Sequence, residues 1–234
     1  MPFWIGFNHW TFLALALPAM LIGIFAQIYL KSTFARYSKV KNRRHLTGYE
    51  AARKILDAKG LHHVRVELTH GHLTDHYDPR SQTVRLSSAT HDSTSLAAVG
   101  VAAHEAGHAI QHAERYAPLT LRSSIVGMTN ISSSLSMILV IAGMFIGGES
   151  SYPLIMAGAI LFSVVAFFQL VTLPVEFNAS RRAMTTLRDV HILDENELDG
   201  SRKVLTAAAM TYVAALIASL LQLLRLIIIA KGRR

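Results

Sequence analysis

The sequence predicts a mainly α-helical, multi-pass membrane protein with about four transmembrane helices and a small soluble α+β part. Three observations favour this fold class. Of the 234 residues, 51% are hydrophobic and 16% are charged, whereas ordinary soluble domains have about 25% charged residues. Four apolar stretches approach the roughly 20 residues that a helix needs to cross a bilayer. Between the first two lies a polar region with helix-like and strand-like patterns. We expect residues 1–234 to form a single membrane-embedded domain.

The four apolar stretches are expected at 11–30, 123–146, 154–175 and 205–229. The first is too long for a signal-peptide core and lacks a basic start and a cleavage site, so it is interpreted as a retained anchor. The second is polar in its first half, from Thr129 to Ser136, which is typical of a helix-packing seam or of a wet route. The third is expected to end at Pro174.

Basic residues predict the orientation. They are concentrated in 31–44 without any acid, and the turn 147–152 carries only Glu149. The positive-inside rule then places 31–122 and 176–204 in the cytoplasm. Lys231 and two further C-terminal arginines conflict with this, so whether the last helix fully spans stays open. Because the net charge of +8 follows from these flanking residues, and no basic patch with interleaved aromatic residues occurs, we expect no nucleic-acid partner.

The soluble region, 46–122, is expected to carry the chemistry. Gly48 to Ala58 has one apolar face and predicts a helix. Residues 64–68 and 83–87 alternate as strands do. A further helix is expected from about 94 to 113, capped by Asp92 or Ser93.

That last helix contains His104-Glu105-Ala106-Gly107-His108. Histidines at i and i+4 share a helix face about 6 Å apart and can bind one ion. The chain has no cysteine, so histidine and carboxylate must hold any metal. The pattern predicts one catalytic Zn²⁺ bound by His104 and His108, with Glu105 as general base toward a metal-activated water.

Catalytic zinc needs a third protein ligand. His112 lies two turns beyond His104, about 12 Å along the helix axis, so it is expected to support the site instead of binding the ion. Glu176, just after Pro174, is the best candidate, because a carboxylate at the hydrocarbon edge must be paired or bound to metal. A salt bridge from Glu176 to Arg181 or Arg182 is the structural alternative.

A competing ligand is Asp199 in Leu198-Asp199-Gly200, a pattern that site-2-type intramembrane proteases use with His-Glu-x-x-His. Here it lies in a charged run that starts at Asp194, which indicates a solvated loop before the last helix. We therefore expect Asp199 not to bind the metal.

Several longer segments resemble the YugP-type neutral zinc metallopeptidases of bacterial membranes. They are Gly48-Tyr49-Glu50-Ala51-Ala52, Leu73-Thr74-Asp75-His76-Tyr77-Asp78-Pro79, the residues 102–111 around the histidine motif, Leu173-Pro174-Val175-Glu176-Phe177-Asn178-Ala179-Ser180, and 204–215. The resemblance implies a multi-pass zinc peptidase of bacterial membranes, with His104 and His108 as ligands and Glu105 as general base. With the orientation given by the basic residues, we expect a small zincin-like catalytic part on the cytoplasmic side of the bacterial cytoplasmic membrane.

The chain also resembles, more remotely, the HtpX-like proteases, which are gluzincin-like. In those proteins the third ligand is a glutamate followed four residues later by aspartate, whereas this chain has Ser180 at that position. The groups that support the zinc-binding histidines therefore stay open, with His112, Asn178 and Ser180 as candidates.

The strand 83–87 is expected to pair with the substrate backbone, as strands beside the zinc helix often do in such peptidases. His76 or Tyr77 could stabilise the oxyanion or only shape the turn before Pro79.

The predicted function is that of a zinc-dependent endopeptidase, itself integrated in the lipid bilayer, which hydrolyses peptide bonds of membrane or misfolded proteins through a zinc-activated water. Two alternatives stay open: a site-2-type protease using Asp199, and a non-catalytic metal-binding membrane scaffold. A transporter would need polar residues in several spans, and only 123–146 has them. Substrate and oligomeric state are not readable from the sequence.

Overall fold

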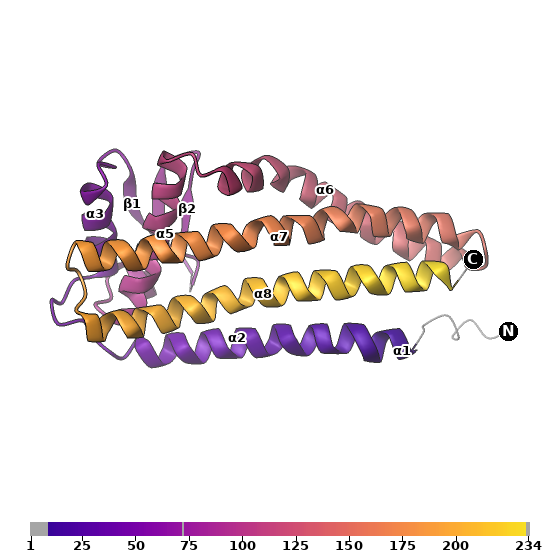
Figure 1. Cartoon of the computed structure of the whole chain (residues 1–234), viewed down its shortest axis with the longest axis horizontal. Helices are drawn as coiled ribbons and strands as arrows, with labels where there is room; N and C mark the ends of the chain where they lie inside the picture. The colour runs from indigo at the N-terminus through magenta and orange to yellow at the C-terminus, as the bar shows by residue number, and fades with distance from the viewer. Residues whose placement is uncertain (1–8, 72, 233–234) are drawn as a thin grey trace. The chain divides into compact units, whose positions relative to one another are not determined.

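The computed structural model describes residues 9–71 and 73–232, and this part of the chain is mainly helical with one small sheet (Figure 1). Its elements are α1 (His9–Thr11), the π-helical segment η2 (Phe12–Ala16), α2 (Leu17–Tyr37), α3 (Gly48–Ala58), β1 (Arg65–Thr69), β2 (His76–Asp78), β3 (Thr83–Ser87), α4 (Ser88–His91), α5 (Leu96–Ala113), α6 (Ala117–Ile146), α7 (Ser151–Asp189) and α8 (Glu195–Lys231). Within the described residues, one compact unit comprises 9–27, 121–173 and 211–232, and the other comprises 28–120 and 174–210.

The first unit contains the apolar helical segments. Among the described residues, four helices are long and apolar enough to cross a membrane: Phe12–Tyr37, Ala117–Ile146, Ser151–Asp189 and Glu195–Lys231. Large apolar side chains on them, such as Phe25, Ile131 and Phe145, are exposed. An apolar surface of this extent is unfavourable in water and favourable in lipid. The predicted fold class, a mainly α-helical membrane protein with a small α+β part, is confirmed.

Small and hydroxyl side chains join α6 to α7 in this unit. Thr129, Ser132 and Ser136 are buried and follow one face of α6. The Ser136 hydroxyl donates to the Gly158 carbonyl oxygen at 2.7 Å, and a Cβ on Gly158 would meet a Val140 methyl carbon at 2.7 Å. Such contacts let two helix backbones approach closely, so these polar residues of the second span form a packing seam.

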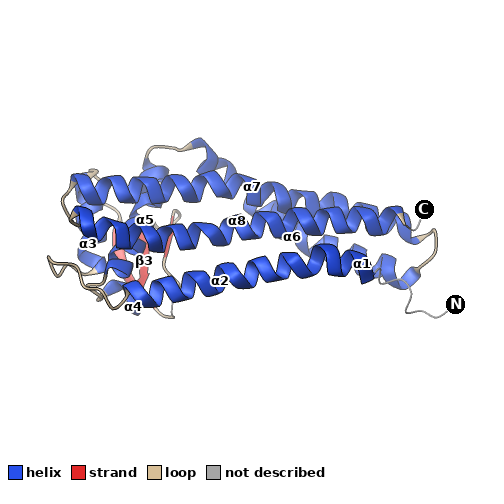
Figure 2. Cartoon of the chain, turned by 60° about the horizontal axis from the view of Figure 1, so that its bottom comes forward, coloured by secondary structure: helices blue, strands red, loops and turns tan. Residues whose placement is uncertain are grey.

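The second unit contains the sheet, which lies among α3, α4 and α5 (Figure 2). Helix α3 has the predicted bounds, and a reciprocal capping box between Thr47 and Glu50 begins it. Its buried face includes Ile55 and Leu56, which belong to a core shared with α5 and with Val84 and Leu86 of the sheet. The core positions α5 against the sheet.

Strand β3 is the middle strand of the three described strands, in the order β1-β3-β2. It pairs in parallel with all five residues of β1, from Arg65↔Thr83 to Thr69↔Ser87, and antiparallel with β2. The expectation that 83–87 receives a substrate strand is therefore wrong, because its neighbours already use its edges. The free edges in the described sheet belong to β1 and to β2, an element that the sequence did not predict.

Three predicted boundaries also differ from the structure. Ser95 caps α5, accepting from the Ala98 N–H at 3.1 Å, in place of Asp92 or Ser93. The short helix α4 occupies residues 88–91, and the backbone of Lys41 pairs with that of Ser95. Helix α5 therefore begins at Leu96, two residues later than the sequence predicted.

Pro174 lies inside α7 instead of ending it. Proline removes one backbone N–H from a helix, which costs about 3 kcal/mol in an isolated helix. The following residues offset this cost, because Val175, Ala179, Ala183 and Leu187 form a fully buried stripe with a spacing of four. Tertiary burial thus continues the helix through the proline.

The charged run is also helical and not a loop, because α8 begins at Glu195, directly after Asp194. Glu195 and Glu197 lie in the first turn of α8, where acidic side chains stabilise the positive end of the helix dipole. Leu198 is buried, and a Cβ on Gly200 would lie 2.7 Å from the Leu96 Cδ1 atom. The Leu-Asp-Gly pattern therefore serves helix packing in this chain.

Candidate metal centre

Helix α5 presents two histidines on one face. His104 and His108 are four residues apart, and their rings meet edge to face with centroids 4.7 Å apart. Small residues on this helix, including Ala102, Ala103 and Ala106, are fully buried. The helix therefore packs closely on its surroundings while its imidazoles project to a common point.

Glu176 of α7 meets both imidazoles. Its Oε2 atom lies 3.2 Å from His104 Nε2 and 3.5 Å from His108 Nε2. The Glu176 side chain is only 3% exposed, so its charge needs a cation or a strong donor nearby. Arg182, one of the two arginines expected as a salt-bridge partner of Glu176, pairs with Glu114 at 2.5 Å.

A glycine allows this approach of α7 to α5. A Cβ on Gly107 would lie 2.6 Å from the Ala179 carbonyl oxygen, closer than real Cβ atoms come to another atom. Gly107 therefore lets the backbone of α7 pass directly beside α5. The spacing that brings Glu176 to the histidines depends on this missing side chain.

The three side chains have the chemistry of a zinc site. One nitrogen from each histidine and one Glu176 oxygen all lie within 4.8 Å of one another. Two imidazoles and one carboxylate, with room for a fourth ligand, are a donor set that catalytic zinc uses. In the described residues, Asp199 is not part of this group; it lies on α8 and pairs with Lys203 at 2.6 Å.

The other nitrogen of each histidine is also held. His104 Nδ1 lies 3.1 Å from the Ser180 hydroxyl oxygen, and His108 Nδ1 lies 3.0 Å from Gln111 Oε1. Gln111 Oε1 can only accept, so His108 Nδ1 carries the proton and Nε2 is free to bind a metal. A Ser180 oxygen that accepts from His104 Nδ1–H gives the same tautomer. Both rings are thus oriented for metal binding through Nε2.

Gln111 is a residue of the site that the sequence reasoning missed. It is fully buried, and its Nε2 donates to the Val175 carbonyl oxygen at 2.8 Å and to Asn178 Oδ1 at 2.9 Å. Asn178 Oδ1 in turn accepts from Arg182 Nε at 2.7 Å. The clue in the sequence is its position three residues after His108, on the same helix face.

Glu105 lies between the two histidines in sequence and is buried. Burial alone would lower the pKa of His108, but the hydrogen bond with Glu176 and the charges of Glu105 and Glu176 outweigh burial and raise that pKa above its ordinary value. The negative charges of Glu105 and Glu176 thus stabilise positive charge at His108. The site favours a cation.

Tyr77 and His112 form a pair beside the histidine motif. The Tyr77 hydroxyl lies 2.8 Å from His112 Nδ1. Burial raises the pKa of Tyr77 to about 12, so the hydroxyl stays protonated at neutral pH, and the tautomer of His112 sets which of the two groups donates. His76, by contrast, is exposed, and its Nδ1 lies 2.8 Å from the Thr74 carbonyl oxygen.

Comparisons with known proteins agree with the chemistry of this centre. Residues 12–231 match a family model described as "Putative neutral zinc metallopeptidase". The chain is 47% identical over 218 residues to the "Putative membrane protease YugP" of Bacillus subtilis (strain 168), and the match covers 93% of this chain and 96% of that protein. No solved structure matches the chain.

Proposed function

The chain belongs to this family of neutral zinc metallopeptidases, as its motifs predict, and from this premise we propose that it is a membrane-integrated, zinc-dependent endopeptidase acting on membrane or misfolded proteins. The observation that carries the proposal is the convergence of His104, His108 and Glu176 within 4.8 Å. These three residues would hold one Zn²⁺ and leave a position open.

A zinc ion in this position would polarise the peptide carbonyl and lower the pKa of a water molecule toward 7. Glu105 would accept the proton of the attacking water and pass it to the leaving nitrogen, a role that is worth about 10²- to 10⁴-fold in rate. Ser180 and Gln111 would keep the two imidazoles in the metal-binding tautomer. Tyr77 is the better of the two candidates for stabilising the oxyanion, because its hydroxyl stays protonated and could accept from His112 Nδ1–H while donating to the oxyanion.

The substrate would add to the sheet at β2. This strand is one of the two edge strands of the described sheet, contacts α5 and carries Tyr77. Backbone pairing with an extended segment requires no particular side chain, so it suits an enzyme that cleaves unfolded chains.

Glu105→Gln is the central test. Wild-type protein purified in detergent should contain one zinc per chain and cleave a fluorescence-quenched unfolded protein. Glu105→Gln should keep the zinc and lose activity at least 100-fold. Equal cleavage by both forms would favour the metal-binding scaffold.

Two further variants test the ligand set. Glu176→Ala should lose the zinc, whereas Asp199→Ala should keep both zinc and activity, because Asp199 pairs with Lys203. Metal loss on Asp199→Ala alone would instead support the site-2-type alternative.

We also propose a bacterial cytoplasmic membrane with the catalytic unit on the cytoplasmic side, from the basic residues in 31–44. The chain has no cysteine, so single cysteines can report its topology. In intact cells, a membrane-impermeant maleimide should label Glu149→Cys and not Lys59→Cys. The reverse pattern would overturn the orientation.

A further inference from the structure

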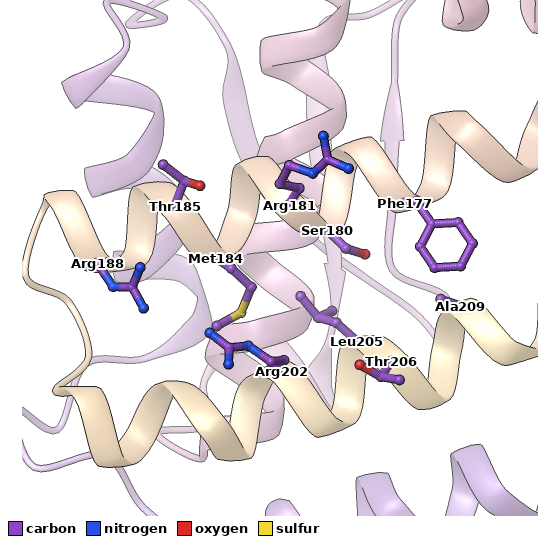
Figure 3. A pocket seen from close by; sticks show the side chains of 10 residues that line it. All are labelled: Phe177, Ser180, Arg181, Met184, Thr185, Arg188, Arg202, Leu205, Thr206 and Ala209. Carbon is purple, nitrogen blue, oxygen red and sulfur yellow. The ribbon is translucent and has the colours of Figure 1, made fainter.

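Helices α7 and α8 form a groove of about 360 Å³ beside the metal-binding residues, wholly within the second unit (Figure 3). Ser180, Met184 and Arg188 extend from α7 toward α8, and Arg202 and Leu205 extend from α8 toward α7. One end is apolar, with Phe177 and Ala209, and the other end is basic. Of its lining residues, only Ser180 has a role in the hydrolysis proposed above.

The groove is positively charged. Three arginines line it, Arg181, Arg188 and Arg202, and its described lining contains no aspartate or glutamate. Arg188 pairs with Glu195 at 2.8 Å, but both side chains are more than half exposed, so this pair contributes little and can exchange for another carboxylate. Arg181 points away from α8, which leaves Arg188 and Arg202 as the groups that face an occupant.

Ser180 connects the groove to the metal centre. It lines the groove, and its hydroxyl contacts His104 Nδ1 at 3.1 Å. An occupant of the groove would therefore lie directly behind a metal-binding histidine. Polar side chains in the lining, Ser180 and Thr206, offer hydrogen bonds to a peptide backbone.

We propose that this groove binds an extended, acidic segment of the protein substrate. An apolar substrate side chain would lie at Phe177 and Ala209, and one or two carboxylates would lie at Arg188 and Arg202. Phe177 and Arg188 are eleven helical residues apart, which is about 16 Å, or about five residues of extended peptide. The preferred substrates would thus carry an apolar residue and, about five positions away, an acidic one.

A membrane lipid fits this groove less well. A lipid phosphate lies where the apolar part of a helix ends, and on α7 that part ends near Val175. Arg188 lies thirteen residues further, about 20 Å along the helix. A headgroup at Arg188 would therefore be far from the hydrocarbon that its acyl chains require, whereas Arg202 lies three residues before the apolar stretch 205–229 and alone could reach a headgroup.

This inference rests on the proposed peptidase function, because it assigns the substrate class of the same site. Arg188 and Arg202 would act on substrate binding and not on the chemical step. Their replacement should raise KM for an acidic substrate and leave kcat unchanged.

Binding is measured with zinc-loaded Glu105→Gln protein in detergent, so that no hydrolysis is needed. The probe is a fluorescent ten-residue peptide with a leucine and, five positions later, two glutamates; a second peptide has glutamines instead. Arg188→Gln with Arg202→Gln should lower the affinity for the acidic peptide roughly tenfold at low salt and leave the affinity for the neutral peptide unchanged. The matched control, Arg44→Gln with Arg80→Gln, removes two exposed arginines elsewhere and should change neither affinity.

A charge-retaining pair, Arg188→Lys with Arg202→Lys, should restore most of the affinity, and melting curves should show that all variants fold. Equal affinity of the wild-type protein for both peptides would overturn the inference, even if the protein hydrolyses peptides. If Arg188→Gln with Arg202→Gln loses copurified phosphatidylglycerol in native mass spectra but keeps its affinity for the acidic peptide, the groove binds lipid and the inference is also overturned. Absence of hydrolysis with intact acidic-peptide binding would instead count against the proposed function alone.

Discussion

Gln111→Met tests how far the metal centre depends on a residue that contacts no metal. Gln111 is fully buried and makes three hydrogen bonds, at 3.0 Å with His108 Nδ1, 2.8 Å with the Val175 oxygen and 2.9 Å with Asn178 Oδ1. Methionine has nearly the same length and volume, so the change removes the amide while leaving little empty space.

The expected magnitude follows from which partners lose their bonds. Asn178 Oδ1 keeps the N–H of Arg182 at 2.7 Å, whereas His108 Nδ1–H loses its only hydrogen-bond partner in the described residues. An unsatisfied buried donor costs about 1–3 kcal/mol, and loss of a group that orients a metal-binding histidine typically weakens metal affinity about 10- to 100-fold. We therefore expect Gln111→Met to fold with reduced stability and to bind zinc at least tenfold more weakly.

The assay is zinc competition with a chromophoric chelator, together with thermal unfolding in detergent. Ser201→Ala is the control, because Ser201 is also fully buried and donates a hydrogen bond, to the Leu96 carbonyl oxygen at 2.7 Å, without contacting a histidine. The control should lose stability and keep its zinc affinity. If Gln111→Met binds zinc as tightly as the wild type, or if Ser201→Ala weakens zinc equally, the orienting role of Gln111 is refuted.

Three further predictions concern the surroundings of the site. Gly107→Ala should destabilise the fold and reduce zinc content, because the added Cβ would lie 2.6 Å from a backbone oxygen. In its control, Gly127→Ala, the added Cβ would have no neighbouring atom within 4 Å, so unfolding experiments should show stability unchanged or raised by up to about 1 kcal/mol. In the same chelator assay, Ser180→Ala should lower zinc affinity less than Gln111→Met does, since Ser180 is partly exposed and water can replace its hydroxyl. The Ser81 hydroxyl and two arginine N–H donors hold the pKa of Asp78 well below its usual range, so the ionised Asp78 stabilises the fold fully above the unfolded-state pKa, and this stabilisation is lost as the pH falls. Asp78→Asn should therefore lower Tm at neutral pH and make Tm decline less between about pH 5 and pH 2. An unchanged decline of Tm in the variant would contradict this origin.

The sequence by itself determined the features that depend on local spacing. Histidines four residues apart share a helix face whatever the helix packs against, so the metal motif was readable from residues 104–108 alone. The apolar lengths of the four spans and the capping box of α3 are local in the same sense. Family membership also followed from motifs within the chain.

Boundaries were less predictable, because packing outweighed local preference. Pro174 would end an isolated helix, but the buried stripe from Val175 to Leu187 extends α7 beyond it. The acidic run before Leu198 is as typical of a helix start as of a loop, and only burial of Leu198 distinguishes the two. Likewise, residues 83–87 alternate as a strand does, but only the pairing places this strand in the middle of the described sheet.

The sequence favoured Glu176 as the third residue of the candidate metal centre, and only the tertiary structure shows it beside the two histidines. A glutamate at the end of an apolar stretch has several possible partners in sequence, and Glu176 meets His104 across 72 residues of chain only because Gly107 lets α7 lie against α5. The same close approach brings Ser180 to His104 and aligns Gln111 with the backbone of α7. These contacts join residues far apart in sequence, and local patterns do not encode them, because each depends on how closely two helices pack.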